Sequence, residues 1–487
     1  MLERLAVVPA LAVLLGSACV VRAEPSINLP YTPSIWARHQ WQILIDQQHI
    51  HAFSSQWPLP SNVVSDALSG VSAQSSESAQ VSSRFVQSEL RQIQHGQLTF
   101  GLVDQADKLV GFAEQATPGS YVEWVGKPAK LNFQEHSLTT RLGLRWEQPS
   151  NSLQSSSDPN SAQVDQVRLS HGYIGLMVGD WMLHAFSRPT WWGPGWQSSL
   201  LDGHNHPQWV GMGLQRAQTH AFEHRYLSWM GPWMLDAFVA QAQDPEVVID
   251  QPTNFLYVGT RFAFKPQPWL EIGLSRGLQV MGKGRPDGVD TFLKSLLGQE
   301  VNEDPDSTFE DSSSQIAGYD VRASCITPWF GETCSGYLQL MGEDAQGDPP
   351  LPMKFMYQLG GDAVWGGGRY RLWFEHSNTY THRGLGWGRL GVGYLNGHYP
   401  QGFTQGTRWI GSSQGGGSRV TTLGLMDAKT QTLWKLHWGE IGISLGSYVP
   451  SASAPHSKLR SLEWSRSFQH GKYVLTPSIG LCSFKPW

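Results

Sequence analysis

Three tryptophans, Trp191, Trp192 and Trp196, lie within six residues of one another in the stretch 188–201. A Gly-Pro-Gly sequence separates the second from the third, and a regular β-strand does not tolerate it. The stretch is therefore predicted to be a rigid turn or an inward-folded loop that fixes the indole rings. Flat indole faces suit stacking on the C–H faces of sugar rings. The same rings could instead pack the wall or the interior of the protein.

Asp202, Arg216 and Glu375 are the polar residues that join the three tryptophans as candidate carbohydrate contacts, because such groups hydrogen-bond hydroxyls. Arg216 and Glu375 have an alternative role, which is to form ion pairs inside the protein. Asp202 opens an Asp-Gly-His-Asn-His sequence that could supply metal ligands. Loop residues this close together are more often surface hydrogen-bonding groups, so we predict neither a metal nor another cofactor.

Catalytic residues are not predicted anywhere in the chain. A hydrolase would need a serine or histidine nucleophile system, and with 17 histidines chance pairs are common. The nearest candidate, His376-Ser377-Asn378, lacks the surrounding pattern of such an enzyme.

The composition narrows the class of protein. Of the 487 residues 15% are charged and 11% aromatic, and 52 are glycine, whereas soluble proteins carry about 25% charged residues. Abundant aromatics argue against disorder. Beyond the N-terminus no run of about 18 apolar residues occurs, which argues against a helical membrane protein. A net charge of -5 without a basic block argues against nucleic acid as a partner.

Residues 1–23 have the pattern of a secretory signal peptide, with an apolar stretch followed by a cleavage site after Ala23. Export places the rest of the chain in an oxidising compartment. Cys325 and Cys334 flank a short Pro- and Gly-containing turn, so they are the candidate disulfide. Cys482 is then left over and is expected to be a small buried side chain of the last strand.

Residues 24–98 have helical periodicity and are predicted to form a small N-terminal helical bundle, on the periplasmic side or as a plug. Ser34 can cap the first helix through its hydroxyl group. Trp41, Leu44 and Ile45 then share one face. Each apolar stripe is narrow, so the helices must pack on one another or on something larger.

From residue 99 to residue 487 the hydrophobic period changes to two. In residues 369–376, for example, Leu372 and Phe374 alternate with Arg371 and Glu375. A soluble sandwich would place the apolar face against a second sheet, whereas an outer-membrane barrel would place it against lipid and the charged face in the lumen. The barrel is favoured, because aromatics cluster at segment ends, many polar-face residues are charged, and the strand-like segments number about 16 to 20.

Long polar segments at residues 149–163 and 282–313 separate these strands, and the second one is acidic. Barrels place long loops outside the cell and short turns in the periplasm. Both segments are therefore expected to be extracellular loops.

The tryptophan motif resembles that of the Wzi family of outer-membrane capsule-assembly proteins. The family's WWGPGW-type sequence followed by Ser-Leu matches 191–196 and 199–200, and Trp57-Pro58-Leu59 and the strands 317–322 and 373–379 also agree. The resemblance spans essentially the whole mature chain. One departure is at Ile410–Gly415, where the family's Ile-Gly-His with a following acidic residue is replaced by Ile-Gly-Ser-Ser-Gln-Gly.

This resemblance implies an all-β fold, an antiparallel barrel of about 18 strands in the Gram-negative outer membrane, with a helical plug. It implies a monomer, with outer-membrane lipid and capsular or extracellular polysaccharide as partners. The polysaccharide would be held non-covalently through many weak contacts. A porin or substrate channel is the first alternative and a barrel-embedded hydrolase the second, while a soluble secreted β protein is a further possibility.

Overall fold

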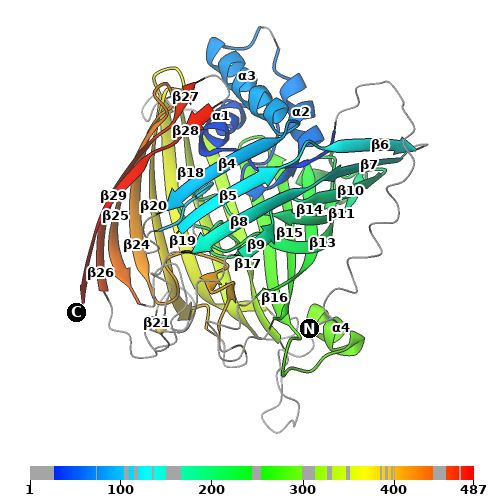
Figure 1. The fold of residues 1–487 in the computed structure, drawn as a ribbon, viewed down its shortest axis with the longest axis vertical. Coiled ribbons are helices and arrows are strands. Elements are labelled where there is room, and N and C mark those ends of the chain that lie inside the picture. The colour runs from blue at the N-terminus through cyan, green and yellow to red at the C-terminus, as the bar shows by residue number, and fades with distance from the viewer. Residues whose placement is uncertain are drawn as a thin grey trace.

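Figure 1 shows the fold of the protein in a computed structural model. It describes residues 27–72, 74–103, 109–114, 119–133, 136–149, 166–243, 254–298, 313–325, 332–346, 351–383, 387–389, 393–395, 399, 401–442, 457–470 and 473–486. The expected signal peptide and residues 150–163 of the loop expected at 149–163 lie outside these ranges.

Three helices lie near the N-terminus, α1 (Ile35–Asp46), α2 (Ser61–Ser69) and α3 (Glu77–Gln92). Ser34 caps α1 as predicted, because its hydroxyl accepts a hydrogen bond from the Ala37 amide at 3.1 Å. Ser76 caps α3 in the same way. The predicted N-terminal helical bundle is confirmed, since α1 and α2 both pack on α3.

The rest of the described chain is mainly β-strand. The barrel strands are β6 (Ala129–Phe133), β7 (His136–Arg141), β10 (Tyr173–Val178), β11 (Trp181–Arg188), β13 (Trp209–Arg216), β14 (Trp233–Gln241), β15 (Leu256–Gln267), β16 (Leu270–Val280), β17 (Ser313–Cys325), β18 (Thr333–Gln346), β19 (Leu351–Trp365), β20 (Tyr370–Arg383), β21 (Trp387–Arg389), β24 (Arg419–Asp427), β25 (Thr432–Ile441), β26 (Ser457–Arg466) and β29 (Ser478–Pro486).

Shorter sheets accompany the barrel. They are formed by β1 (Pro30–Tyr31) with β3 (Leu59–Pro60), β2 (Gln56–Trp57) with β12 (Trp191–Trp192), β22 (Thr404–Gln405) with β23 (Arg408–Trp409), β27 (Phe468–His470) with β28 (Tyr473–Leu475), and by β4 (Gln97–Val103), β5 (Gly119–Val125), β8 (Gly143–Pro149) and β9 (Gln166–Leu169). A 3₁₀ turn, η3 (Ser228–Met230), and a fourth α-helix, α4 (Val289–Leu297), lie in connections between barrel strands.

The barrel strands follow one another in chain order, and the ring closes through β6 and β7 onto β10. Every strand pair whose register is given is antiparallel. No described helix is long and apolar enough to cross a membrane. The predicted all-β barrel is therefore confirmed.

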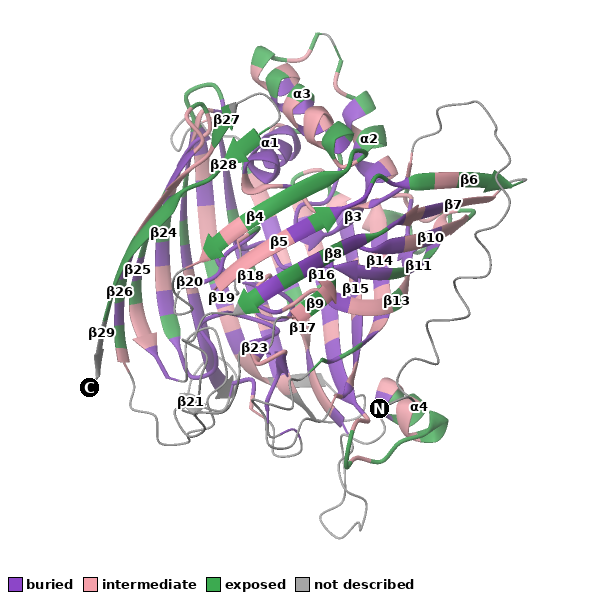
Figure 2. Cartoon of the chain, viewed as in Figure 1, coloured by how far each residue is buried: buried purple, intermediate pink, exposed green. Residues whose placement is uncertain are grey.

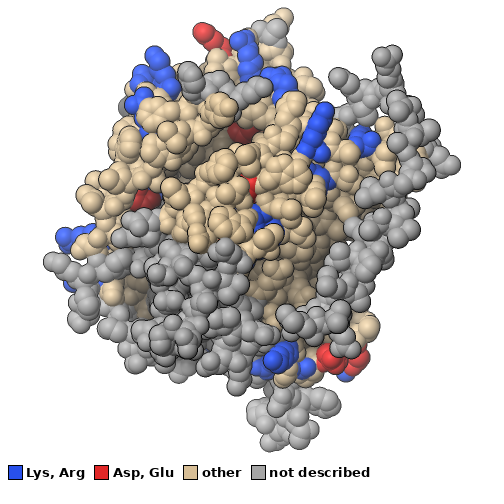
Figure 3. Space-filling view, in the orientation of Figure 1, with Lys and Arg blue, Asp and Glu red and all other residues tan. Residues whose placement is uncertain are grey.

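The period-two alternation sorts side chains between the outside and the inside of the barrel, as Figure 2 shows by its alternating colours. On β20, Leu372 and Phe374 are 38% and 43% exposed, while Arg371 and Glu375 are 0% and 2% exposed. The apolar face is thus the outer one and the charged face the inner one, which is the arrangement of a barrel in lipid. On the face drawn in Figure 3, the wall between the two ends is mainly uncharged.

The two ends of the barrel differ (Figure 1). The helical end carries α1, α2 and α3 and short connections such as Gln267–Leu270 and Trp365–Tyr370. The loop end carries α4, which lies in the connection between β16 and β17, whereas the connection 217–232 between β13 and β14 lies at the helical end. The predicted loop at 282–313 thus contains a helix, which the sequence analysis did not predict.

Segments from both ends fill the interior. At the helical end, α1 and residues 47–60, here called the plug segment (residues 35–60), lie against the inner wall, and every α1 residue from Trp36 to Asp46 is buried. The Asp46 carboxylate accepts hydrogen bonds from Arg322 of β17 at 2.7 and 2.9 Å. Residues 189–208, here called the inward segment, join β11 to β13 and meet the plug segment through the pairing of β12 with β2.

Candidate functional site

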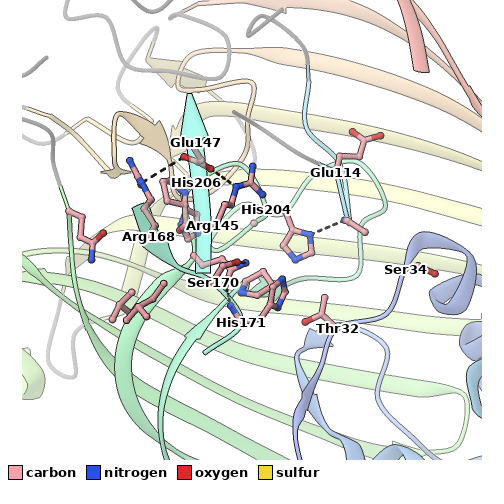
Figure 4. A pocket seen from close by; sticks show the side chains of 18 of the residues that line it. Thr32, Ser34, Glu114, Arg145, Glu147, Arg168, Ser170, His171, His204 and His206 are labelled. Carbon is pink, nitrogen blue, oxygen red and sulfur yellow. Dashed lines mark hydrogen bonds and ion pairs between the residues drawn. The ribbon is translucent and has the colours of Figure 1, made fainter. Parts of the chain in front are cut away.

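A polar cleft lies between the inner face of β8 and β9 and the inward segment (Figure 4). Its volume is about 270 Å³. The start of α1 and residues 113–114 also contribute to its lining. The polar side chains on the lining are Thr32, Ser34, Glu114, Arg145, Glu147, Arg168, Ser170, His171, His204, His206, Gln208 and Gln243.

The strand period places the charged groups of the cleft on the inner face. On β8, Leu144 and Trp146 are exposed on the outside, whereas Arg145 and Glu147 are buried inside. The Arg145 Nε lies 2.5 Å from one Glu147 oxygen, and the Arg168 Nε of β9 lies 3.7 Å from the other. Figure 4 shows this carboxylate between the two guanidinium groups. Paired planar donors and an acceptor of this kind can hydrogen-bond adjacent hydroxyl groups.

His204 lies on the lining beside residues 113–114. Its Nδ1 accepts a hydrogen bond from the Ala113 amide at 2.8 Å, so the proton of the neutral ring is on Nε2. Burial, followed by the nearby positive groups of His206 and Arg38, lowers the pKa of His204 to about 3. The ring is therefore neutral at pH 7. Its Nε2 has no hydrogen-bond partner among the described residues.

Gln208 lines the same side of the cleft, and Asp202, which does not line it, holds the lining residue His206. The Asp202 carboxylate accepts hydrogen bonds from His206 Nε2 at 2.9 Å and from the Trp209 indole at 3.2 Å. Burial raises the pKa of Asp202 above its usual range, against the lowering effect of those two donors. Gln208 donates to Ser170 and accepts from the His171 amide, so it joins the inward segment to the wall.

The chemistry of the cleft is that of hydrogen bonding. No group of three or more His, Cys, Asp or Glu side chains that could hold a metal ion occurs among the described residues. His376 and Ser377 are adjacent on β20 and hence point to opposite faces of the wall. They do not form a nucleophile–base pair, because the His376 Nδ1 contacts Thr421 instead, at 2.9 Å.

The three candidate tryptophans are all on the inward segment and are 0–1% exposed. Trp191 packs on Phe112 and His204, with ring centres 5.3 Å away in each case. Trp192 packs on Phe238. Packing thus accounts for these two positions, and stacking on a sugar would require the rings to become accessible.

Trp196 occupies a cationic environment. Its ring lies 5.7 Å from that of Trp373, and the Arg38 and Arg371 guanidinium carbons lie 4.5 and 5.0 Å from its centre. The Glu375 carboxylate accepts a hydrogen bond from the Trp196 amide at 2.8 Å and one from Tyr337 at 3.0 Å. Glu375 therefore holds the inward segment against the wall.

Arg216 lies elsewhere. Gln215 faces the interior, where it donates to the Pro58 carbonyl, so the next residue of β13 faces outward. The Arg216 guanidinium lies 3.6 Å from the Trp233 ring centre and donates to the His220 and Trp233 carbonyls at the helical end. Of the predicted contacts, Asp202, Glu375 and the tryptophans are brought together, and Arg216 is not.

Cys325 and Cys334, paired directly across β17 and β18 with Cα atoms 5.0 Å apart, form a disulfide in the structure. Cys482 is exposed on β29 rather than buried. It packs no core at that position.

Sequence reasoning missed Arg145, Glu147 and Arg168, and it considered His204 only as a possible metal ligand. A signal existed for Arg145 and Glu147. Arg145 and Glu147 alternate with Leu144 and Trp146, so strand periodicity alone assigns them to the inner face. What the sequence does not reveal is that the inward segment folds back against this part of the wall.

Comparison with known proteins bears on the whole arrangement. The family model for capsule assembly protein Wzi matches residues 68–428. The chain belongs to this family. The resemblance noted in the tryptophan motif is thereby confirmed.

A relative and a solved structure extend the comparison with the Wzi family. The chain is 32% identical over 193 residues to an uncharacterized 55.8 kDa protein in the cps region of Klebsiella pneumoniae, a match over 40% of this chain and 36% of that protein. The match thus spans about a third of that relative. The solved structure is Wzi, an outer-membrane protein involved in group 1 capsule assembly in Escherichia coli and a carbohydrate-binding β-barrel. It is 21% identical, with a TM-score of 0.73 over 94% of this chain and 96% of that one.

At 21% identity the structural likeness concerns the fold. Fold and family together make this chain a β-barrel of the Wzi family.

Proposed function

We propose that this protein holds capsular or extracellular polysaccharide at the surface of a Gram-negative cell by non-covalent binding, and that a short stretch of the glycan enters the polar cleft. The observation that carries the proposal is the Arg145–Glu147–Arg168 group, which faces the inward segment across a cleft of about 270 Å³. Ligand pockets usually measure about 300–1,000 Å³. The cleft therefore suits a small part of a long chain.

Binding of this kind is strong only when it is repeated. One sugar contact contributes little, but a polysaccharide that meets many copies of the protein is held by all of them together. No bond to the glycan needs to form or break, so an enzyme is not required. Family membership supports the proposal, because the family is one of capsule assembly.

The orientation follows from the connections. Long loops of outer-membrane barrels lie outside the cell and short turns face the periplasm. We therefore place the loop end outside and residues 24–98 on the periplasmic side. A monomer in contact with outer-membrane lipid is consistent with the apolar outer wall. The filled interior at the helical end gives the porin alternative less support.

Deletion of the protein provides the first test. Cells that lack it should shed more polysaccharide into the medium and retain less on the surface, measured by uronic-acid or hexose assay of the two fractions. A deletion strain that retains as much surface polysaccharide as its parent contradicts the proposal.

The cleft is tested with Arg168→Ala and Gln243→Ala. Loss of one hydrogen-bonding partner removes about 0.5–1.5 kcal/mol, so purified variants should bind oligosaccharide fragments of the polysaccharide about two- to tenfold more weakly in calorimetry. Gln241→Ala is the control, because Gln241 is exposed at the end of β14, two residues before Gln243, and does not line the cleft. Equal binding by all three variants would remove the cleft from the proposal, while the deletion result would still test the function.

A further inference from the structure

The helix α4 lies on the outside of the barrel wall at the loop end (Figure 1). Three residues of that wall, Val258, Leu278 and Val280, are buried even though the strand period points them outward. Phe292 and Leu296 of α4 pack on them. The helix therefore covers part of the surface that would otherwise face lipid.

A single arginine fixes the end of this helix. Arg276 shares the outward face of β16 with Leu274, which is 47% exposed, whereas Ser275 between them contacts Arg261 in the interior. The Arg276 guanidinium donates to the carbonyls of Ser295 at 2.8 Å and Leu296 at 2.5 Å, and its Nε donates to Gln315 at 2.9 Å. The carbonyls of the last helical turn carry partial negative charge, so a guanidinium group that donates to two of them holds the helix against the wall.

The surface of α4 is divided into three parts. Phe292 and Leu296 face the wall. Next around the helix come Val289, Leu293 and Leu297, spaced four residues apart, which are 76%, 49% and 67% exposed. Beyond them lie Asp290 and Lys294, which form an exposed ion pair at 2.7 Å.

Around the helix, the side that faces the wall is followed by the apolar stripe and then by the charged pair. The surroundings of a helix at a membrane surface change in the same order, from protein to lipid to water. A residue beside the barrel wall meets lipid first and water farther out. The outer face of the wall that carries α4 also has exposed apolar side chains, since Leu274 and its strand neighbour Tyr319 are 47% and 40% exposed. Amphipathic helices with one apolar and one charged side lie in this position at membrane interfaces.

We propose that α4 lies in the interfacial layer of the outer leaflet, with the Val289–Leu293–Leu297 stripe in contact with lipid acyl chains. Arg276 holds the helix on the wall, and the stripe fixes the depth of the loop end in the membrane. This role needs only the outer-membrane location, so it stands apart from glycan binding.

Site-directed spin labelling tests the proposal on the full-length protein. The labels are placed at Leu293→Cys and, as the matched control, at Asp290→Cys, both in a Cys482→Ser background. The protein is reconstituted in vesicles of phosphatidylethanolamine and phosphatidylglycerol. At position 293 collisions with oxygen, which concentrates in lipid, should exceed those with a water-soluble nickel chelate several-fold. The ratio should be reversed at position 290.

Three results would overturn the proposal. A label at 293 that collides with the nickel chelate as often as the one at 290 places the stripe in water. Low collision rates with both reagents show that another part of this chain covers it. Dipolar broadening that grows with the protein-to-lipid ratio shows that a second copy occupies it. A third label at Leu297→Cys repeats the test, and heat-modifiable gel mobility verifies that each variant is folded.

Discussion

Two glycines, Gly193 and Gly195, allow the inward segment to lie close to the inner wall. A Cβ at Gly195 would overlap the Gln358 side chain and the Ser198 carbonyl, because the backbone passes directly over the inner wall. Gly193 has a positive φ of 157° and lies against Gln339. The Gly-Pro-Gly sequence is thus needed where the two tryptophan-bearing halves of the segment meet the wall.

Gly195→Ala should destabilise the protein by about 1–3 kcal/mol, the usual cost of inserting an atom into a packed site. The expected readout is a lower urea midpoint for loss of heat-modifiable mobility. Gly336→Ala on β18 is the control, since a Cβ there meets no heavy atom of the described residues within 4 Å. If both variants unfolded at the wild-type midpoint, the close approach at Gly195 would not limit stability.

At the scale of single residues, the sequence predicts local conformation better than it predicts which distant residues come into contact. The Gly-Pro-Gly turn and the inward fold follow from local backbone chemistry. The contact between Trp196 and Glu375 joins residues 179 positions apart and depends on the register of every strand between them. Arg216 shows the same limit, because a shift of one residue along a strand moves a side chain to the opposite face.

The elements are connected by buried charges rather than by apolar contacts alone. The plug segment reaches the wall through Asp46 on Arg322 and through the amides of Ser54 and Ser55, which donate to Glu271 at 3.0 Å. His39 accepts from Arg371 through Nδ1 and contacts the Gly368 carbonyl through Nε2. Burial, with the Arg371 charge, lowers the pKa of His39 to about 3, so the ring is neutral in this network.

Asp46→Asn should loosen the plug segment while leaving the barrel folded. Arg322 would keep only Asp362, at 4.0 Å, as a carboxylate partner among the described residues. A buried charge that loses its partner costs up to about 3–5 kcal/mol. Limited proteolysis should then cut residues 27–92 faster, with unchanged heat-modifiable mobility. Asp66→Asn on the exposed side of α2 is the control, and equal cleavage of the two variants would contradict this role of the ion pair.

Helix and strand types followed well from the sequence, since α1 has a serine cap and a clear apolar face and the strands alternate strictly. The helix α4 did not, because its apolar residues complete an amphipathic surface only beside a wall formed by β15 and β16. Packing against the wall thus stabilises this helix, whereas the pattern of its nine residues alone does not predict it.

On the scale of the whole molecule, segments from both ends of the barrel fill its interior. The plug segment fills the helical end of the interior. The inward segment meets it there through the pairing of β12 with β2. A cleft remains along one side of the interior formed by the described residues. The sequence predicted the barrel, its outer-membrane location and its family, but not the cleft, because a cavity is the space that remains after all segments are placed.

A filled interior predicts little ion flow. In planar bilayers the purified protein should give no large, steady currents, whereas Asp46→Asn should open intermittently as its plug segment moves. Steady wild-type currents like those of a diffusion porin would contradict the filled interior and favour the channel alternative. A well-studied porin measured in the same bilayer serves as the reference.

The anchoring of the inward segment also sets an order of assembly. The segment follows β11, but it is held by Gln339 of β18, Gln358 of β19 and Glu375 of β20, which come 139 to 179 residues later in the bonded pairs. The inward segment therefore cannot take its final position until β18, β19 and β20 have joined the wall. Burial of its tryptophans thus reports that the wall is formed as far as β20.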